Sequence, residues 1–314
     1  MSASVQDRQQ QDTDASSRVL ERAQSVLAEQ LAQKLPPGLY LVATPIGNLG
    51  DISLRALSVL ARADLIAAED TRHSRKLLSH FAIKAELTAY HEHNAAKERP
   101  RLLARIGAGF SVALVSDAGT PLISDPGYKL VREALDAGFA VISIPGPSAV
   151  MAGLTSVGLP TDTFLFGGFL PPKSGPRQKR LEELKTVPAT LLFFETAPRL
   201  PKSLADMAEV LGPREAALAK ELTKLHERVA RGTLPELARE IEPVAALKGE
   251  FVVVIAPPSP DETLISDDAI VAELKQALEG ESFRDAVRSV AERFKLKRSH
   301  VYELGLALQR GDEG

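Results

Sequence analysis

Acidic side chains stand at the ends of two apolar runs in this sequence. Glu69 and Asp70 close one run, and Asp117 follows another. A carboxylate at the end of a buried strand can accept a proton from a reacting group. Arg72 lies just beyond and could hold a phosphate. The pattern predicts acid–base chemistry, and the alternative is that Glu69 and Arg72 form a structural ion pair.

Three loops rich in glycine and proline could hold a small polar ligand. They are residues 44–48, 116–127 and 145–149. Proline fixes the backbone and glycine lets it approach a ligand closely, so these loops are rigid and expose backbone groups. The alternative is that they are tight turns. In that interpretation Asp125 caps a helix beginning near Gly127, and Ser148 caps a helix at 149–156.

Several other kinds of site are excluded by what the sequence lacks. No phosphate-binding loop of the G-x-x-x-x-G-K-[ST] or G-x-G-x-x-G type occurs, which argues against a nucleoside triphosphatase and a classical dinucleotide-binding protein. H-E-x-x-H and G-x-S-x-G are also missing, which weakens the metalloprotease and α/β-hydrolase interpretations. With no cysteine, disulfides, cysteine-ligated zinc, iron–sulfur clusters and a cysteine nucleophile are excluded. His91 and His93 could share one face of a strand, but two histidines without a third ligand rarely bind a metal. We therefore expect no metal.

Composition is that of an ordinary globular protein. The 314 residues predict about two domains. Aromatic residues make up only 5%, which argues against a surface built on many stacked rings. The net charge of -3 disfavours a uniformly basic nucleic-acid binder but leaves room for a local basic patch. Since no apolar run approaches the roughly 18 residues that span a bilayer, and cysteine is absent, we expect a cytoplasmic protein without a membrane segment.

Strands alternate with helices along most of the chain. Residues 1–17 are polar and read as a disordered tail, and 19–35 have a helical period. Strands are predicted at 39–44, 64–69, 87–90, 112–116 and 139–144, and in a second unit at 163–166, 190–195, 216–222 and 250–256. Alternation predicts an α/β fold with a parallel, doubly wound first sheet, in which ligands sit beyond the carboxyl ends of the strands. The predicted divisions are 1–37, 38–157, 158–260 and a helical piece at 261–314.

Seven segments taken in order resemble one family. They read TPIGN, AEDTR, YHEHN, SDAGTPLISDPG, IPGPSA, FFETAPRL and GEFVVVI. This order is similar to that of the ribosomal RNA small subunit methyltransferase I family, within the tetrapyrrole methylase superfamily of S-adenosylmethionine-dependent enzymes. The resemblance covers about residues 38–258, and the helical piece is also similar. LVATPIGNLGD with SDAGTPLISDPG separates the chain from corrin and porphyrin methylases, whose first loop is typically Gly-rich.

The resemblance implies a fold, a reaction and a set of cofactor contacts. The fold is two α/β domains with the cofactor in the cleft between them. The reaction is methyl transfer from S-adenosylmethionine to the ribose 2′-hydroxyl of a cytidine in the decoding centre of 16S ribosomal RNA, by a homodimer. The cofactor contacts, carried over by matching motif or by position after a strand, are Pro45, Gly47, Ser116, Asp117, Ala118, Gly119, Thr120, Ile123, Ser148, Ala149, Phe194, Glu195, Leu222 and Thr223.

We assign catalytic roles from these positions. Glu69 or Asp70 would accept the proton of the ribose hydroxyl, with Glu195 in reserve. Arg72 would hold an RNA phosphate. His91 and Asn94 would help to seat the nucleotide.

Two basic segments are predicted to contact RNA. One is a Gly/Pro-containing loop expected to close as a mobile lid, with Lys173, Arg177, Lys179 and Arg180. The other is residues 281–310, with seven lysines and arginines against four acids and a net charge of +3. This part has helical spacing and predicts a helix-turn-helix unit that presents Lys295, Lys297 and Arg298, with Ser299 as an N-cap. The alternative for both segments is an ordinary solvated charged surface.

Other functions stay open on the sequence. The chain could be a tetrapyrrole methyltransferase of the same architecture, although the AEDTR motif and the local basicity argue against this. It could be a ribosome-assembly binding protein without catalysis, its loops then being plain turns. A sugar-nucleotide enzyme using the same kind of cleft is a third alternative.

Overall fold

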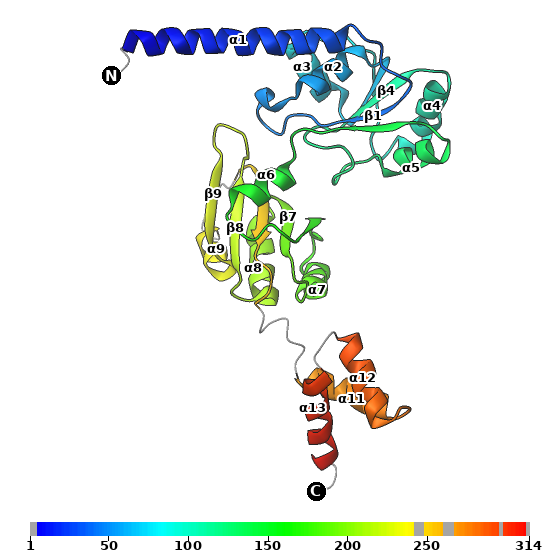
Figure 1. Cartoon of the computed structure of the whole chain (residues 1–314), viewed down its shortest axis with the longest axis vertical. Helices are drawn as coiled ribbons and strands as arrows, with labels where there is room; N and C mark the ends of the chain where they lie inside the picture. The colour runs from blue at the N-terminus through cyan, green and yellow to red at the C-terminus, as the bar shows by residue number, and fades with distance from the viewer. Residues whose placement is uncertain (1–4, 242–247, 260–266, 295–297, 312–314) are drawn as a thin grey trace.

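The computed structural model describes residues 5–241, 248–259, 267–294 and 298–311. Two α/β domains follow one another along the chain, and the residues described after the second domain form three helices (Figure 1). No helix in the described ranges combines the length and hydropathy needed to cross a membrane.

A parallel sheet forms the first domain. Its strands, in spatial order, are β3 (Leu87–Ala89), β2 (Leu65–Ala68), β4 (Ser111–Val115), β1 (Gly38–Val42) and β5 (Val141–Ile144). All four neighbouring pairs are parallel, which confirms the predicted doubly wound sheet. Within β2 the apolar side chains alternate between two cores: Ile66 and Ala68 face one, and Leu65 and Ala67 face the other. Both faces of this sheet are therefore covered, as is typical of parallel sheets.

Helices pack on both sides of this sheet. They are α2 (Leu54–Arg62), α3 (Thr71–His80), α4 (Ala95–Gly107) and α5 (Tyr128–Asp136). Val59 and Leu78 place α2 and α3 on one face, and Leu102 and Leu130 place α4 and α5 on the other. A short 3-10 helix (Leu49–Asp51) follows the first loop.

The second domain contains a mixed sheet. In spatial order its strands are β6 (Phe164–Phe169), β7 (Thr190–Thr196), β10 (Glu250–Ile255), β8 (Glu215–Lys220) and β9 (Arg228–Thr233). β6 and β7 run parallel, and the remaining pairs are antiparallel. One face packs on α7 (Ser174–Leu184), α8 (Leu200–Leu211) and α9 (Leu234–Ile241).

Helix α6 (Ala149–Ser156) joins the two domains. Its Val150 and Leu154 pack in the core on the other face of the second sheet. Gly153 lets the helix approach β10 closely, because a Cβ there would lie 2.8 Å from Val252 Cγ1. Ile46, from the first loop, packs against the same core. The loops of the first domain are thereby held against the second sheet.

Three elements differ from the sequence-based expectation. The strand β9 was not predicted; its residues RVARGT alternate only weakly, and none of them is buried. The expected disordered tail is wrong from Val5 onward, because α1 (Val5–Leu31) begins there. Its first turns are rich in glutamine and free of glycine and proline, and glutamine is a good helix former. The third difference is α7, which replaces the predicted flexible loop at 173–180.

The last three helices share a core of their own. They are α11 (Asp267–Leu278), α12 (Phe283–Arg293) and α13 (Arg298–Gly311). Ile270, Leu274, Val287 and Val301 are buried in this core. Figure 1 shows the group beyond the second domain, after the Pro-rich residues 257–259, which carry no helix or strand.

Candidate active site

A cavity of about 320 Å³ lies between the two domains. It is lined from both sides, and its volume falls in the range typical of small-molecule sites. The first domain contributes Ile46, Glu69, Asp117, Ala118, Gly119, Thr120, Ile123, Ser124, Asp125, Ser148, Ala149 and Val150. The second contributes Phe169, Phe194, Glu195, Thr196, Ala219, Glu221, Leu222, Lys224, Glu250, Phe251 and Val252. Most of the residues carried over as cofactor contacts thus meet around one space.

Hydrogen bonds tie the three loops of the first domain together. Thr44 and Gly119 exchange two backbone bonds of 2.9 Å, and Thr44 Oγ1 donates to the Ser116 carbonyl. Thr120 Oγ1 donates to the Pro147 carbonyl at 3.3 Å. Ser148 caps α6 by accepting from the Met151 N–H, as predicted, while it also lines the cavity. The loops therefore form one rigid wall.

The first loop also touches the second domain. A Cβ on Gly47 would lie 2.4 Å from Lys224 Cγ and 2.9 Å from Thr223 Oγ1, so only glycine fits there without a shift. Pro45 is not among the residues that line the cavity. Its neighbour Ile46 is, and Pro45 can act on the cavity only by fixing the course of the loop.

Three carboxylates stand at the first-domain end of the cavity. Burial, followed by the charge of Asp117, raises the pKa of Glu69. Burial, followed by the charge of Glu69, raises the pKa of Asp125 to about 6. Asp125 was expected only to cap a helix, but α5 starts at Tyr128 and its N-cap residue, Gly127, has no side chain to offer. The sequence did hold a signal that Asp125 belongs to the site, because it is a second acid in the same Gly/Pro-rich loop as Asp117.

Asp70 and Arg72 lie outside the cavity lining. Asp70 caps α3 by accepting from the Arg72 N–H at 2.8 Å. Its other oxygen pairs with the Arg72 guanidinium at 2.8 Å, and these contacts hold the pKa of Asp70 well below its usual range. The structural ion pair considered for Arg72 therefore forms with Asp70 instead of Glu69. The side chain of Arg72 is 84% exposed and is accessible to a large substrate.

His91 and Asn94 have different surroundings. Asn94 Oδ1 accepts from the His91 N–H at 2.8 Å, and its Nδ2 donates to the Ala89 carbonyl at 2.9 Å. The amide of Asn94 thus holds its own turn, and the expectation that Asn94 helps to seat a nucleotide stays a prediction. Among the described residues, His91 Nδ1 is buried without a hydrogen-bond partner, and the charge of His91 lowers the pKa of Glu69. No group of three or more potential metal ligands occurs within the described ranges.

The second-domain wall combines aromatic and aliphatic side chains with charged ones. The ring of Phe194 packs edge-on against those of Phe166 and Phe169, at centroid distances of 4.7 and 5.6 Å. Leu222 lines the cavity, and Thr223 Oγ1 is buried with no hydrogen-bond partner in the part of the chain that the structure describes. Thr223 has a positive φ of 65°, a strained conformation for a β-branched residue.

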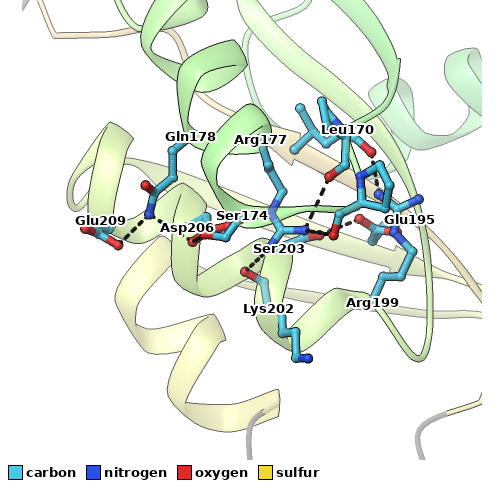
Figure 2. A network of polar contacts seen from close by, with 12 residues as sticks. Leu170, Ser174, Arg177, Gln178, Glu195, Arg199, Lys202, Ser203, Asp206 and Glu209 are labelled. Atoms are coloured by element: carbon cyan, nitrogen blue, oxygen red, sulfur yellow. Dashed lines mark hydrogen bonds and ion pairs between the residues drawn. The ribbon is translucent and has the colours of Figure 1, made fainter.

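Glu195 is committed to a structural network (Figure 2). Its Oε2 accepts from Ser203 Oγ at 2.5 Å, and its Oε1 accepts from the Thr196 N–H. Arg199 pairs with the same carboxylate at 3.2 Å. Because both oxygens are engaged, Glu195 is poorly placed to serve as the reserve base.

The structure corrects the expectation that Arg177 belongs to a mobile RNA-binding lid. Arg177 lies in α7 with only 3% of its side chain exposed, and its Nε donates to Asp206 Oδ2 at 2.6 Å. Its remaining nitrogens donate to the carbonyls of Pro171, Pro172 and Lys202 (Figure 2). A residue with this burial cannot contact RNA. Lys173, Lys179 and Arg180 are exposed, and Arg180 pairs with Glu183.

The other basic segment is described in part. Lys295 and Lys297 lie outside the described residues. Arg298 is exposed and pairs with Glu292 at 2.7 Å. Ser299 was expected as an N-cap, but α13 begins one residue earlier, at Arg298.

Comparison with known protein families shows to which family the chain belongs. The family model for Tetrapyrrole (Corrin/Porphyrin) Methylases matches residues 38–238. The chain belongs to the tetrapyrrole methylase family. The match spans the first domain and most of the second. It includes the residues that line the cavity, except those of β10.

Within the tetrapyrrole methylase family, curated relatives carry one name. "Ribosomal RNA small subunit methyltransferase I" of Mesorhizobium japonicum is 58% identical over 72% of this chain and 77% of its own length. The protein of the same name from Vibrio cholerae is 46% identical over 86% of this chain and 94% of its own. The Escherichia coli O157:H7 protein is 44% identical over 86% and 95%. The chain therefore belongs to this branch of the family.

Several solved structures of methyltransferases and related enzymes share the fold. Diphthine synthase matches with a TM-score of 0.55 and 19% identity, over 69% of this chain and 89% of that one. Cobalt precorrin-4 methyltransferase matches with a TM-score of 0.53 and 16% identity, over 69% and 94%. Uroporphyrin-III C-methyltransferase from Thermus thermophilus, complexed with S-adenosyl homocysteine, matches with a TM-score of 0.50 and 23% identity, over 69% and 96%.

Proposed function

We propose that this chain transfers a methyl group from S-adenosylmethionine to the ribose 2′-hydroxyl of a cytidine in the decoding centre of 16S ribosomal RNA. Membership of the methylase family and the shared name of the relatives support S-adenosylmethionine as donor and small-subunit ribosomal RNA as substrate. The observation that carries the proposal is the cavity, which joins the three rigid loops, the apolar side chains of Phe194 and Leu222, and the Glu69 carboxylate with its raised pKa.

The walls of the cavity suit the methyl donor. The donor supplies an electrophilic methyl carbon on a positively charged sulfur, next to a purine ring and an amino acid group. Phe194 and Leu222 offer apolar surface to a ring, and the loop at 117–120 offers backbone groups. Asp117 and Glu69 place negative charge where a cationic group would be stabilised. Holding donor and acceptor in line is itself worth up to about 7–11 kcal/mol of the barrier.

Glu69 is the base in this mechanism. The ribose oxygen attacks the methyl carbon, the carbon–oxygen bond forms as the carbon–sulfur bond breaks, and the hydroxyl proton passes to the Glu69 carboxylate. Its raised pKa brings it closer to working pH, which makes proton transfer more favourable. We favour Glu69 over the other two candidates, because Arg72 keeps the pKa of Asp70 low and the carboxylate of Glu195 is engaged in its structural network.

Arg72 and the exposed lysines of α7 supply charge for RNA. Arg72 lies three residues after Glu69 in the chain and presents its guanidinium to solvent. Lys173 and Lys179 are exposed near the start of α7, which follows the cavity-lining Phe169. In this proposal Arg72, Lys173 and Lys179 contact phosphates of the RNA. The active form of the enzyme is a homodimer in the cytoplasm.

The decisive experiment combines mapping in cells with turnover in solution. Mass spectrometry of ribosomal RNA from cells with and without this chain should show one 2′-O-methylated cytidine that depends on it. Purified small subunits with labelled donor should reproduce the modification. Glu69→Gln should lower single-turnover methylation by about 10²-fold or more while calorimetric binding of S-adenosylhomocysteine stays unchanged. The exposed Glu182→Gln, on α7, is the control.

Each alternative gives a different result in the same assays. Labelling of a corrin or porphyrin in place of RNA would identify a tetrapyrrole methyltransferase. Binding of the small subunit without uptake of the cofactor would identify an assembly protein. Normal turnover by Glu69→Gln would remove the base from the mechanism but leave the reaction in place.

A further inference from the structure

A second hollow lies far along the chain from the active site, between α12 and α13. Its volume is about 580 Å³, and none of its residues lines the cavity between the domains. Its lining combines two aromatic rings, three arginines, one aliphatic side chain and one hydroxyl. They are Phe283, Arg284, Val287, Arg288, Arg298, Ser299 and Tyr302.

Helical spacing gathers these side chains on facing surfaces. On α12, one helical turn separates 283 from 287 and 284 from 288. On α13, one turn separates both 298 and 299 from 302. The rings of Phe283 and Tyr302 meet edge-on at a centroid distance of 5.4 Å. A Cβ on Gly305 would lie 2.9 Å from Phe283 Cε2, so glycine at this position lets the ring lie close to α13. Tyr302 remains 48% exposed, which leaves part of its ring available to a ligand.

The charge around these rings is positive. No acidic side chain is among the described residues that line the hollow. Arg288 pairs with Asp285 at 2.6 Å and Arg298 with Glu292 at 2.7 Å, but all four side chains are about half or more exposed. Exposed ion pairs of this kind contribute little, so exchanging a carboxylate for a phosphate costs little.

We propose that this hollow binds an unpaired nucleotide of an RNA strand. The base stacks on Tyr302, and Arg284, Arg288 and Arg298 contact the flanking phosphates. An aromatic ring beside arginines is the chemistry used to hold unstacked bases, whereas the bases of a duplex are not free to stack on protein. An acidic peptide would use the arginines but leave the ring without a role. The inference rests on the proposed function in that RNA is the substrate, and it adds a contact remote from the methylated ribose.

The test uses the full-length chain and labelled RNA of about 12 nucleotides, as a single strand and as a duplex. Fluorescence anisotropy without cofactor gives the affinity. Tyr302→Leu should weaken single-strand binding about tenfold, while Tyr302→Phe keeps it within about twofold. Arg284→Gln with Arg288→Gln should also weaken binding and reduce the salt slope by about 1.4. Arg132→Gln, an exposed and paired arginine on α5, is the matched control.

Three results would overturn the inference. They are wild-type affinity in a folded Tyr302→Leu variant, equal affinity for duplex and single strand, and full competition by polyglutamate. Thermal unfolding of each variant shows whether α11–α13 stay folded, and the Tyr302→Phe variant separates loss of the ring from loss of structure. S-adenosylhomocysteine binding and methylation are measured separately. Tyr302-dependent RNA binding without methylation would refute the proposed function and leave this inference standing.

Discussion

The carboxylate of Asp117 accepts a hydrogen bond from the backbone N–H of Asp70, with 3.0 Å between Oδ1 and the nitrogen. These two residues lie just beyond the carboxyl ends of the neighbouring strands β4 and β2. The bond fixes Asp117 beside Glu69, the residue that precedes Asp70. The negative charge of Asp117 then adds to burial in raising the pKa of Glu69.

The first prediction concerns the pH dependence of methylation. Asp117→Asn keeps an oxygen that can accept from the Asp70 N–H but removes the charge that raises the pKa of Glu69. As pH falls, the rate is lost when Glu69 becomes protonated, because a protonated carboxyl cannot accept the ribose proton. The acid limb of the kcat/KM profile should therefore move to lower pH in the variant. An unmoved limb, or one moved to higher pH, would contradict the assignment of Glu69.

The second prediction concerns stability near Asp125. Its pKa is raised to about 6, chiefly by burial, so the folded chain favours the protonated form. Stability from this group is fully present below the unfolded pKa of 3.8 and is lost as pH rises through about 6. Asp125→Asn removes that loss. We expect the variant to unfold with a free energy about 1 kcal/mol higher at neutral pH, after allowance for solvent screening, and with no difference near pH 3, below the unfolded pKa.

Denaturant titrations at the two pH values measure this difference. Asp136→Asn, an exposed acid on α5 paired with Arg132, is the control and should change little at either pH. A stabilisation of Asp125→Asn that is equal at both pH values would point to packing and not to ionisation.

Most of the fold follows from local patterns in the sequence. The strands of the first sheet read as short apolar runs because both faces are buried, and Pro- and Gly-rich loops mark their ends. The edge strand β9 has no such pattern, since none of RVARGT is buried and its pairing with β8 decides its structure. The helix α7 was missed because Gly175 and Pro176 signal a loop, although both fall in its first turn, where they are tolerated.

The site could be predicted from the sequence where a polar or acidic residue directly follows a predicted strand. Glu69, Asp117 and Ser148 each follow a strand, and the sheet alone brings them together. Asp125 could not be distinguished from a cap, because the course of its loop depends on positive φ angles at Leu122 and Ser124. Arg177 could not be recognised as buried, because its partner Asp206 lies 29 residues further along the chain.

The third prediction uses that buried pair. Arg177→Met leaves the Asp206 carboxylate buried without its cation, although Ser174 and Gln178 still donate to it. We expect a loss of about 3–5 kcal/mol in the free energy of unfolding. Arg177→Met with Asp206→Leu should recover most of this loss, since no unpaired charge remains. Lys179→Gln, exposed on the same helix, is the control; a loss in that variant as large as in Arg177→Met would contradict the argument.

The fourth prediction concerns the contact between the two domains at Gly47. Gly47→Ala places a methyl group 2.4 Å from Lys224 Cγ and 3.1 Å from the Leu222 carbonyl oxygen. The side chain of Lys224 can shift, but the backbone at Leu222, which lines the cavity, must also give way. Overpacking of this kind costs about 1–3 kcal/mol, and we expect S-adenosylhomocysteine to bind about tenfold more weakly by calorimetry.

The matched control for Gly47→Ala is Gly175→Ala on α7. A Cβ there meets nothing within 4 Å, and alanine favours the helix. Cofactor binding should therefore stay unchanged in Gly175→Ala, with a slight gain in stability. If Gly47→Ala binds the cofactor product as tightly as the wild type, the first loop and the turn at Leu222 are not part of one binding wall, and the cofactor must lie elsewhere in the cavity.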